Sequence, residues 1–152
     1  MNFASFSDLF PIIPELILVF SVILLILVDL FGPNSSQKSL LAVALTGLGF
    51  AFLAEIFLFQ EQVTGFWESV SMDPFSNLFE ILFILIAFLT LCSSQSYLPH
   101  HSIKRGEYYV LILCSVIGMM FMVSALDFLL IFIGIEIMSI SSYILNNSDQ
   151  KL

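Results

Sequence analysis

The sequence contains five predominantly apolar runs, each about as long as a helix that crosses a membrane. They cover residues 12–30, 40–59, 75–94, 108–125 and 128–145. A helix of about 20 apolar residues spans the hydrocarbon core of a bilayer, which is roughly 30 Å thick. A transmembrane barrel would instead alternate apolar and polar residues over about ten positions. The sequence therefore predicts an all-α, polytopic transmembrane helix bundle that forms a single membrane domain over residues 1–152.

Short polar signals place two helix boundaries. Asp73-Pro74 is typical of an N-cap followed by proline at the first helical position. Asp127 marks a tight connection between the fourth and fifth runs, so these two helices should be antiparallel neighbours. In the fourth run, Ser115 and Gly118 are small enough to let another helix approach closely.

The composition argues against several kinds of function. Acidic residues outnumber basic ones by 12 to 4, and the net charge of −8 does not suit a nucleic-acid partner. Cys92 and Cys114 are too few and too isolated for a disulfide framework or a metal site, and His100 and His101 lack metal-ligand spacing. The sequence has no phosphate-binding glycine loop, CxxC, HExxH or nucleophile elbow. We therefore expect no metal, no cofactor and no redox or hydrolytic centre on this chain.

The few basic residues predict the orientation in the membrane. Five spans place the two termini on opposite sides of the bilayer. If the N-terminus is outside, every basic residue lies inside, as the positive-inside rule requires: Lys38, Lys104, Arg105 and Lys151. The acids that then lie outside or at that face are Asp8, Glu61, Glu68, Asp73 and Asp127. We therefore expect the C-terminus on the matrix or cytoplasmic side.

Glu136 is the candidate functional residue, because it lies almost at the centre of the last apolar run. In a helix it would be about 12 Å from either end of the run, near the midplane of the bilayer. A charge there costs about 3 kcal/mol, and acids at this depth are rare unless they serve a pathway. Ser139 and Tyr143 follow on the same face and could relay or solvate a proton. The alternative is that Glu136, Ser139 and Tyr143 only form hydrogen bonds to a neighbouring helix.

Two other acids lie within apolar runs. Glu55 is about a turn from the end of the second run, where a carboxylate can reach headgroups and water, so we expect an interfacial acid. Glu80 is deeper in the third run but off its centre. Between them, residues 60–73 are expected to form an acidic connecting loop with Trp67 at the membrane interface.

Several segments resemble one family when they are taken in order. They are PEL at 14–16 with Asp29 ending the first helix, MDPFSNLF at 72–79, GEYYVLIL at 106–113, IGMMFM at 117–122 and GIEIMSISSYIL at 134–145. They resemble the N-terminal part of chain 2, or subunit N, of proton-pumping NADH:quinone oxidoreductase, which is respiratory complex I. In that family the acid of the fifth helix is a membrane-embedded carboxylate on a proton path, and the resemblance implies this role for Glu136.

The resemblance also implies the setting of the chain. It would be a non-redox, antiporter-like subunit of an H⁺-translocating enzyme, without a complete active site of its own. NADH, flavin, iron–sulfur clusters and quinone would be bound by other subunits. Family members continue through further helices, including a broken seventh helix whose lysine pairs with this glutamate. We therefore expect a split subunit, with a second polypeptide supplying those helices, other membrane-arm subunits as partners, and lipid around the bundle.

Two alternatives remain at this point. The chain could be a structural membrane scaffold in which Glu136 is vestigial, or a subunit of a cation/proton antiporter-like complex, which shares the embedded glutamate. The Phe-rich, Lys/Arg-poor composition and the lack of an import presequence favour the mitochondrial inner membrane. A bacterial plasma membrane and a thylakoid membrane are the alternative locations.

Overall fold

The computed structural model describes residues 10–31, 37–59, 63–65, 69–97 and 105–149. Its elements are α1 (Ile13–Phe31), α2 (Gln37–Leu58), β1 (Val63–Gly65), β2 (Val70–Met72), α3 (Pro74–Tyr97), α4 (Arg105–Ser124) and α5 (Phe128–Asp149). All five helices are long and apolar enough to cross a membrane, which confirms the five predicted helices. The expectation of an all-α fold was incomplete, because the described residues also include two short strands.

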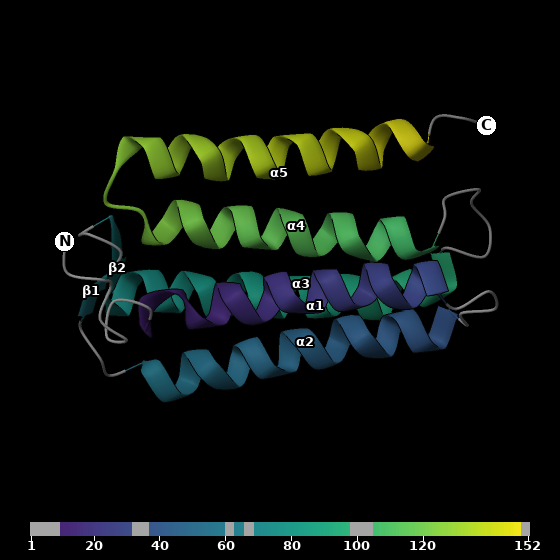
Figure 1. Cartoon of the computed structure of the whole chain (residues 1–152), viewed down its shortest axis with the longest axis horizontal. Helices are drawn as coiled ribbons and strands as arrows, with labels where there is room; N and C mark the ends of the chain where they lie inside the picture. The colour runs from purple at the N-terminus through teal and green to yellow at the C-terminus, as the bar shows by residue number, and fades with distance from the viewer. Residues whose placement is uncertain (1–9, 32–36, 60–62, 66–68, 98–104, 150–152) are drawn as a thin grey trace.

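The five helices lie side by side and alternate in direction along the chain (Figure 1). Helix α4 is central and contacts α1, α2, α3 and α5. The strands, the start of α3 and the connection from α4 to α5 share one end of the bundle, which we call the hairpin end (Figure 1). Helices α2 and α4 begin at the opposite end. This arrangement places Lys38 and Arg105 at one end and Asp73 and Asp127 at the other.

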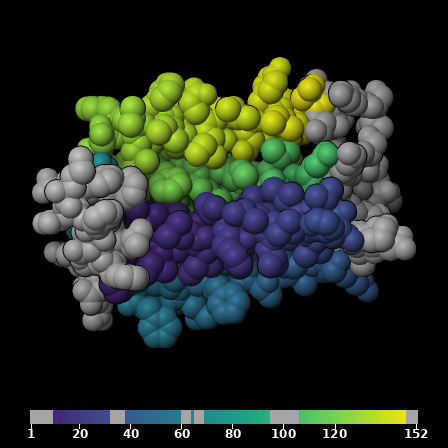
Figure 2. Space-filling model, viewed as in Figure 1, coloured from purple at the N-terminus to yellow at the C-terminus, as the bar shows by residue number. Residues whose placement is uncertain are grey.

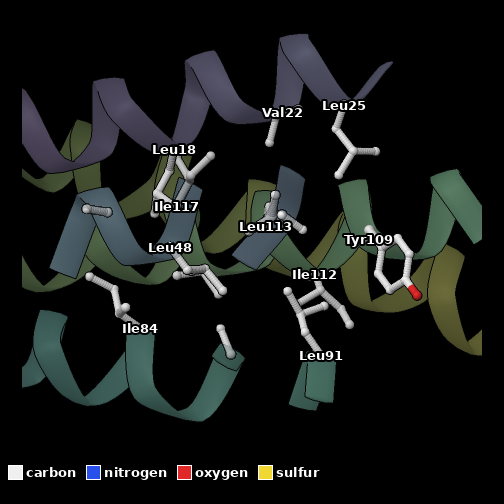
Figure 3. Packing of buried hydrophobic residues seen from close by; sticks show 14 of the residues in the cluster. Leu18, Val22, Leu25, Leu48, Ile84, Leu91, Tyr109, Ile112, Leu113 and Ile117 are labelled. Carbon is white, nitrogen blue, oxygen red and sulfur yellow. The ribbon is translucent and has the colours of Figure 1, made fainter. Parts of the chain in front are cut away.

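Buried side chains from four helices form the hydrophobic core. Leu18 of α1, Leu48 of α2, Ile84 of α3 and Leu113 of α4 point into the same space (Figure 3). They follow the helical spacing that places apolar residues on one face of each helix. Among the described residues, the fully buried members of this core come from α1 to α4 and none from α5. Helix α5 is therefore added to a four-helix core, along one edge of the molecule (Figure 2).

A β-hairpin occupies part of the segment that was expected to be a connecting loop. Strands β1 and β2 pair antiparallel, with Val63 opposite Met72. The hairpin also holds the α4–α5 connection, because Val70 bridges Ala125 and the Leu126 N–H donates to the Ser69 carbonyl oxygen at 2.8 Å. The rest of the loop, including Trp67, lies outside the described residues. The hairpin thus links the α2–α3 connection to the α4–α5 connection.

Asp73 caps the start of α3, as the sequence predicted. The Ser76 backbone N–H donates to Asp73 Oδ1 at 2.7 Å, and the Asp73 N–H donates to Ser76 Oγ at 3.1 Å. These reciprocal bonds satisfy backbone donors that a helix start leaves unpaired. The hydrogen bond from the Ser76 N–H also lowers the pKa of Asp73 below its ordinary value. The cap therefore weakens only when acid protonates Asp73, as the pH falls through this lowered pKa.

Helices α4 and α5 meet backbone to backbone. A Cβ atom added to Gly118 would lie 2.8 Å from the Gly134 carbonyl oxygen, and one added to Gly134 would lie 2.7 Å from the Gly118 carbonyl oxygen. Real Cβ atoms do not come this close to a carbonyl, so each position requires glycine. This crossing confirms that α4 and α5 are close neighbours and that Gly118 permits the approach.

Candidate functional site

Glu136 lies on the side of α5 that faces away from the other helices that the structure describes. Gly134 and Ser141 are buried, and they mark the face of α5 that packs on α4. Glu136 follows Gly134 by two residues, which is about 200° around a helix. Its side chain is accordingly exposed.

Ser139 and Tyr143 lie on the same side as Glu136. Both are exposed, and Tyr143 retains 73% of its accessible surface. Together with Phe132 and Ile140 they form what we call the outer face of α5, a stripe at helical spacing. The structure therefore places all three predicted site residues on one surface, and that surface is turned away from α4.

The outer face is mostly apolar apart from Glu136 and the two hydroxyl groups. Phe132 and Ile140 flank Glu136 at one turn on either side, and both are more than half exposed. An ionised carboxylate in hydrocarbon is costly, and carboxylates at membrane depth normally face protein or a water-filled cavity. The helices that the structure describes provide no such cover for Glu136, whose side chain is exposed.

A second group of acids lies inside the bundle. We call it the acid cluster: Glu15 of α1, Glu55 of α2 and Glu80 of α3, with 0%, 0% and 3% of their surfaces exposed. Glu15 is near the start of α1, Glu55 near the end of α2 and Glu80 two turns into α3, so all three are near the hairpin end. Each carboxyl group is close enough to another to interact electrostatically. Three helices thus bring three acids to one buried place.

The expectation that Glu55 is an interfacial acid was wrong. Distance from the helix end fixes its depth, but the face of α2 on which it lies decides whether it meets water. Ala44, Leu48, Ala51 and Glu55 are all buried and follow one another at intervals of three or four residues. They therefore share the core-facing side of α2. The same spacing links Glu80 to the buried Ile84 of α3 and would have predicted its burial too.

Comparison with known proteins assigns the chain to a family. No protein-family model matches it. It is 38% identical over 134 residues to NADH-quinone oxidoreductase subunit N of Trichlorobacter lovleyi, covering 88% of this chain and 28% of the relative. It is 34% identical over 147 residues to subunit N of Ruthia magnifica, covering 95% of this chain and 30% of the relative. The chain belongs to the subunit N family.

The chain is also similar to a relative that carries a different name. NAD(P)H-quinone oxidoreductase subunit 2 of a Synechococcus strain is 33% identical over 133 residues, covering 87% of this chain and 25% of the relative. The chain thus spans about three tenths or less of the length of these curated relatives. The family assignment made from the ordered sequence segments is confirmed.

The carboxyl groups of this subunit N relative are suited to acid–base chemistry. Among the residues that the structure describes, no three or more His, Cys, Asp or Glu side chains are arranged to hold a metal ion. Among the described residues, carboxyl groups lie within the membrane-length helices at two places: Glu136 on the outer face of α5, and the acid cluster between α1, α2 and α3. Carboxyl groups of this kind can take up and release protons.

Proposed function

We propose that this chain is part of the membrane arm of an NADH-quinone oxidoreductase, where it contributes to proton translocation coupled to electron transfer. Glu136 is the carboxylate on the proton path. The observation that carries this proposal is a lone acid near the middle of a membrane-length helix, on a face that the other described residues leave uncovered. The similarity to subunit N supports the assignment to that enzyme.

In this proposal Glu136 binds a proton and passes it on. Its neutral form suits the apolar surroundings, and its ionised form is stabilised when a cationic or hydrogen-bonding group of a covering helix comes close. The hydroxyl groups of Ser139 and Tyr143 can donate hydrogen bonds along the same face, and both can accept them. The chain itself carries out no redox step, since NADH, flavin, iron–sulfur clusters and quinone belong to other subunits in this proposal.

We further propose that membrane helices outside α1 to α5 cover the outer face of α5. The split-subunit hypothesis places these helices on a second polypeptide. The exposed apolar side chains beside Glu136 support a protein cover, because protein can satisfy the acid whereas lipid tails cannot.

A photo-crosslinking residue at position 140 should capture the polypeptide that covers α5. Ile140 lies on the outer face one turn from Glu136, and 55% of its surface is exposed. We expect a protein crosslink in membranes that oxidise NADH, and mass spectrometry should identify the captured polypeptide. The matched control is position 57, because Phe57 is 84% exposed on α2, along the opposite edge of the molecule. If position 140 captured only lipid, the proposed cover would be wrong.

The orientation of the bundle gives a second expected result. Cysteines at positions 38 and 127 should react with a membrane-impermeant maleimide from opposite sides, because Lys38 and Asp127 lie at opposite ends of the bundle. With the N-terminus outside, position 38 is labelled from the matrix or cytoplasmic side and position 127 from the outside. Cys92 and Cys114 are first replaced with Ser, and vesicles of both orientations are compared. The reversed labelling pattern would contradict the proposed topology.

We propose the mitochondrial inner membrane as the location. Its support is the scarcity of basic residues, four in a chain of 152, together with 17 Phe residues.

A further inference from the structure

The acid cluster lacks a cation that could neutralise it. Its three acids face one another from α1, α2 and α3, and Asp73 at the start of α3 adds another acid that interacts with Glu80. Helix α4 also packs against these helices, but its half at the hairpin end, residues 116–124, contains no ionisable side chain. The strand β2 contains none either. Among the described residues, therefore, the ionisable side chains that face the acid cluster are all acids.

Several buried acids with no cation beside them cannot all be ionised. Moving a single carboxylate from water into an apolar interior is already very costly, and neighbouring carboxylates also repel each other. Groups in this situation bind protons and become neutral. Bound protons are therefore the simplest counter-charge for the acid cluster.

A buried amide next to the acid cluster points to water as well. Asn77 is only 1% exposed, and its Oδ1 and Nδ2 have no hydrogen-bond partner among the described residues. It lies one helical turn before Glu80, on the same buried face of α3. Both carboxyl oxygens of Glu15 and of Glu55 likewise lack a partner with good hydrogen-bond geometry among the described residues, although the Glu55 and Glu80 carboxyl groups are close enough to share a hydrogen bond. Buried water characteristically binds such groups, because one molecule can donate to an oxygen and accept from an N–H.

We propose that Glu15, Glu55, Glu80 and Asn77 form a second intramembrane proton-binding site, which holds exchangeable protons on its carboxyl groups and on water. Asp73 connects this site to the hairpin end, where it is half-buried. Each transfer moves one proton, leaving the donor as a carboxylate and the acceptor as a neutral acid. The site lies between α1, α2 and α3 and is separate from the outer face of α5. It therefore does not depend on the role proposed for Glu136.

The test uses membranes that contain the chain in its native assembly and an apolar carbodiimide, dicyclohexylcarbodiimide. This reagent adds to protonated carboxyl groups in apolar surroundings and leaves a mass increase that peptide mapping can locate. We expect adducts on one or more of Glu15, Glu55 and Glu80, and we expect them to decrease as the pH is raised. Glu107, an exposed acid in the first turn of α4, is the control and should stay unmodified at neutral pH.

Two variants make the result decisive. Glu80→Gln matches the neutral acid in shape, so the chain should accumulate in the membrane to within about twofold of the parent. Glu80→Lys supplies an internal cation, so the adducts on Glu15 and Glu55 should be lost while the chain still accumulates.

Three outcomes would overturn the proposal. The first is a parent chain without an adduct on any of the three acids, and the second is a Glu80→Gln chain that fails to accumulate while Glu80→Asp accumulates. The third is protection of the three acids by Na⁺ at constant pH, which would identify a cation site instead.

Discussion

Replacing Glu136 with Gln should abolish proton translocation through this subunit while the chain still assembles. Gln keeps the size of the side chain and its ability to form hydrogen bonds, but it has no titratable proton. Positioned acid–base groups typically contribute factors of about 10² to 10⁴, so we expect coupled NADH:quinone turnover and proton uptake to fall about 100-fold. Both are measured in membranes that contain the assembled enzyme. Glu136→Asp should retain part of the activity, because it keeps the carboxyl group.

The control for this experiment is Glu107→Gln. Glu107 is an exposed acid at the start of α4, so its replacement removes a charge without changing a midplane group. Oxidation of NADH by artificial acceptors should be unchanged in both variants, because that reaction needs no proton transfer in the membrane. If Glu136→Gln assembled and pumped like the parent, the proton-path role would be lost and the structural scaffold would be the better interpretation.

Gly134→Leu should prevent the chain from accumulating. At this position even a Cβ atom would lie 2.7 Å from the Gly118 carbonyl oxygen, and a backbone cannot move aside as a flexible side chain can. Overpacking a tight site costs about 1–3 kcal/mol even for small additions, and a whole isobutyl group at a backbone contact must separate the two helices. Because α5 packs chiefly on α4, losing this crossing should leave α5 undocked. Immunoblots of membranes and native gels of the assembled complex measure the effect.

A matched glycine is available for comparison on α2. A Cβ atom added to Gly49 would meet no atom within 4 Å, so Gly49→Leu should accumulate nearly as well as the parent. Equal loss of both variants would mean that leucine is harmful in any of these helices. Normal accumulation of Gly134→Leu would show that the close α4–α5 crossing is not needed.

The helices could be predicted from the sequence because an apolar run is a local signal. The family could be predicted because several short segments occur in a fixed order along the chain. Runs of about 20 apolar residues are sufficient to identify a membrane helix. The short connection at Asp127 was sufficient to predict the α4–α5 pair. The hairpin was missed because three-residue strands carry almost no pattern, and one of its bonds joins Ser69 to the distant Leu126.

The sequence predicted the depth of the candidate site residue Glu136 but not the direction of its side chain. The depth of Glu136 follows from counting residues, but the direction of its side chain depends on which face of α5 meets α4. Gly118 and Gly134 settle that direction, and the significance of Gly134 becomes visible only when the two helices are placed together. For the same reason the convergence of Glu15, Glu55 and Glu80 could not be read from any one helix. Helical spacing could have predicted the burial of each acid, but whether the three acids lie close together depends on how the three helices pack.

The absence of α5 from the described core has a consequence for how the chain matures in the membrane. Helices emerge from the ribosome in order, and the contacts among α1, α2, α3 and α4 are complete without the fifth helix. The first four helices can therefore settle into a unit while α5 is still being made. Helix α5 then joins through α4 and the hairpin, with Glu136 still facing outward. The side of α5 that carries Glu136 is thus the edge of this five-helix unit to which further parts of the assembly can be added.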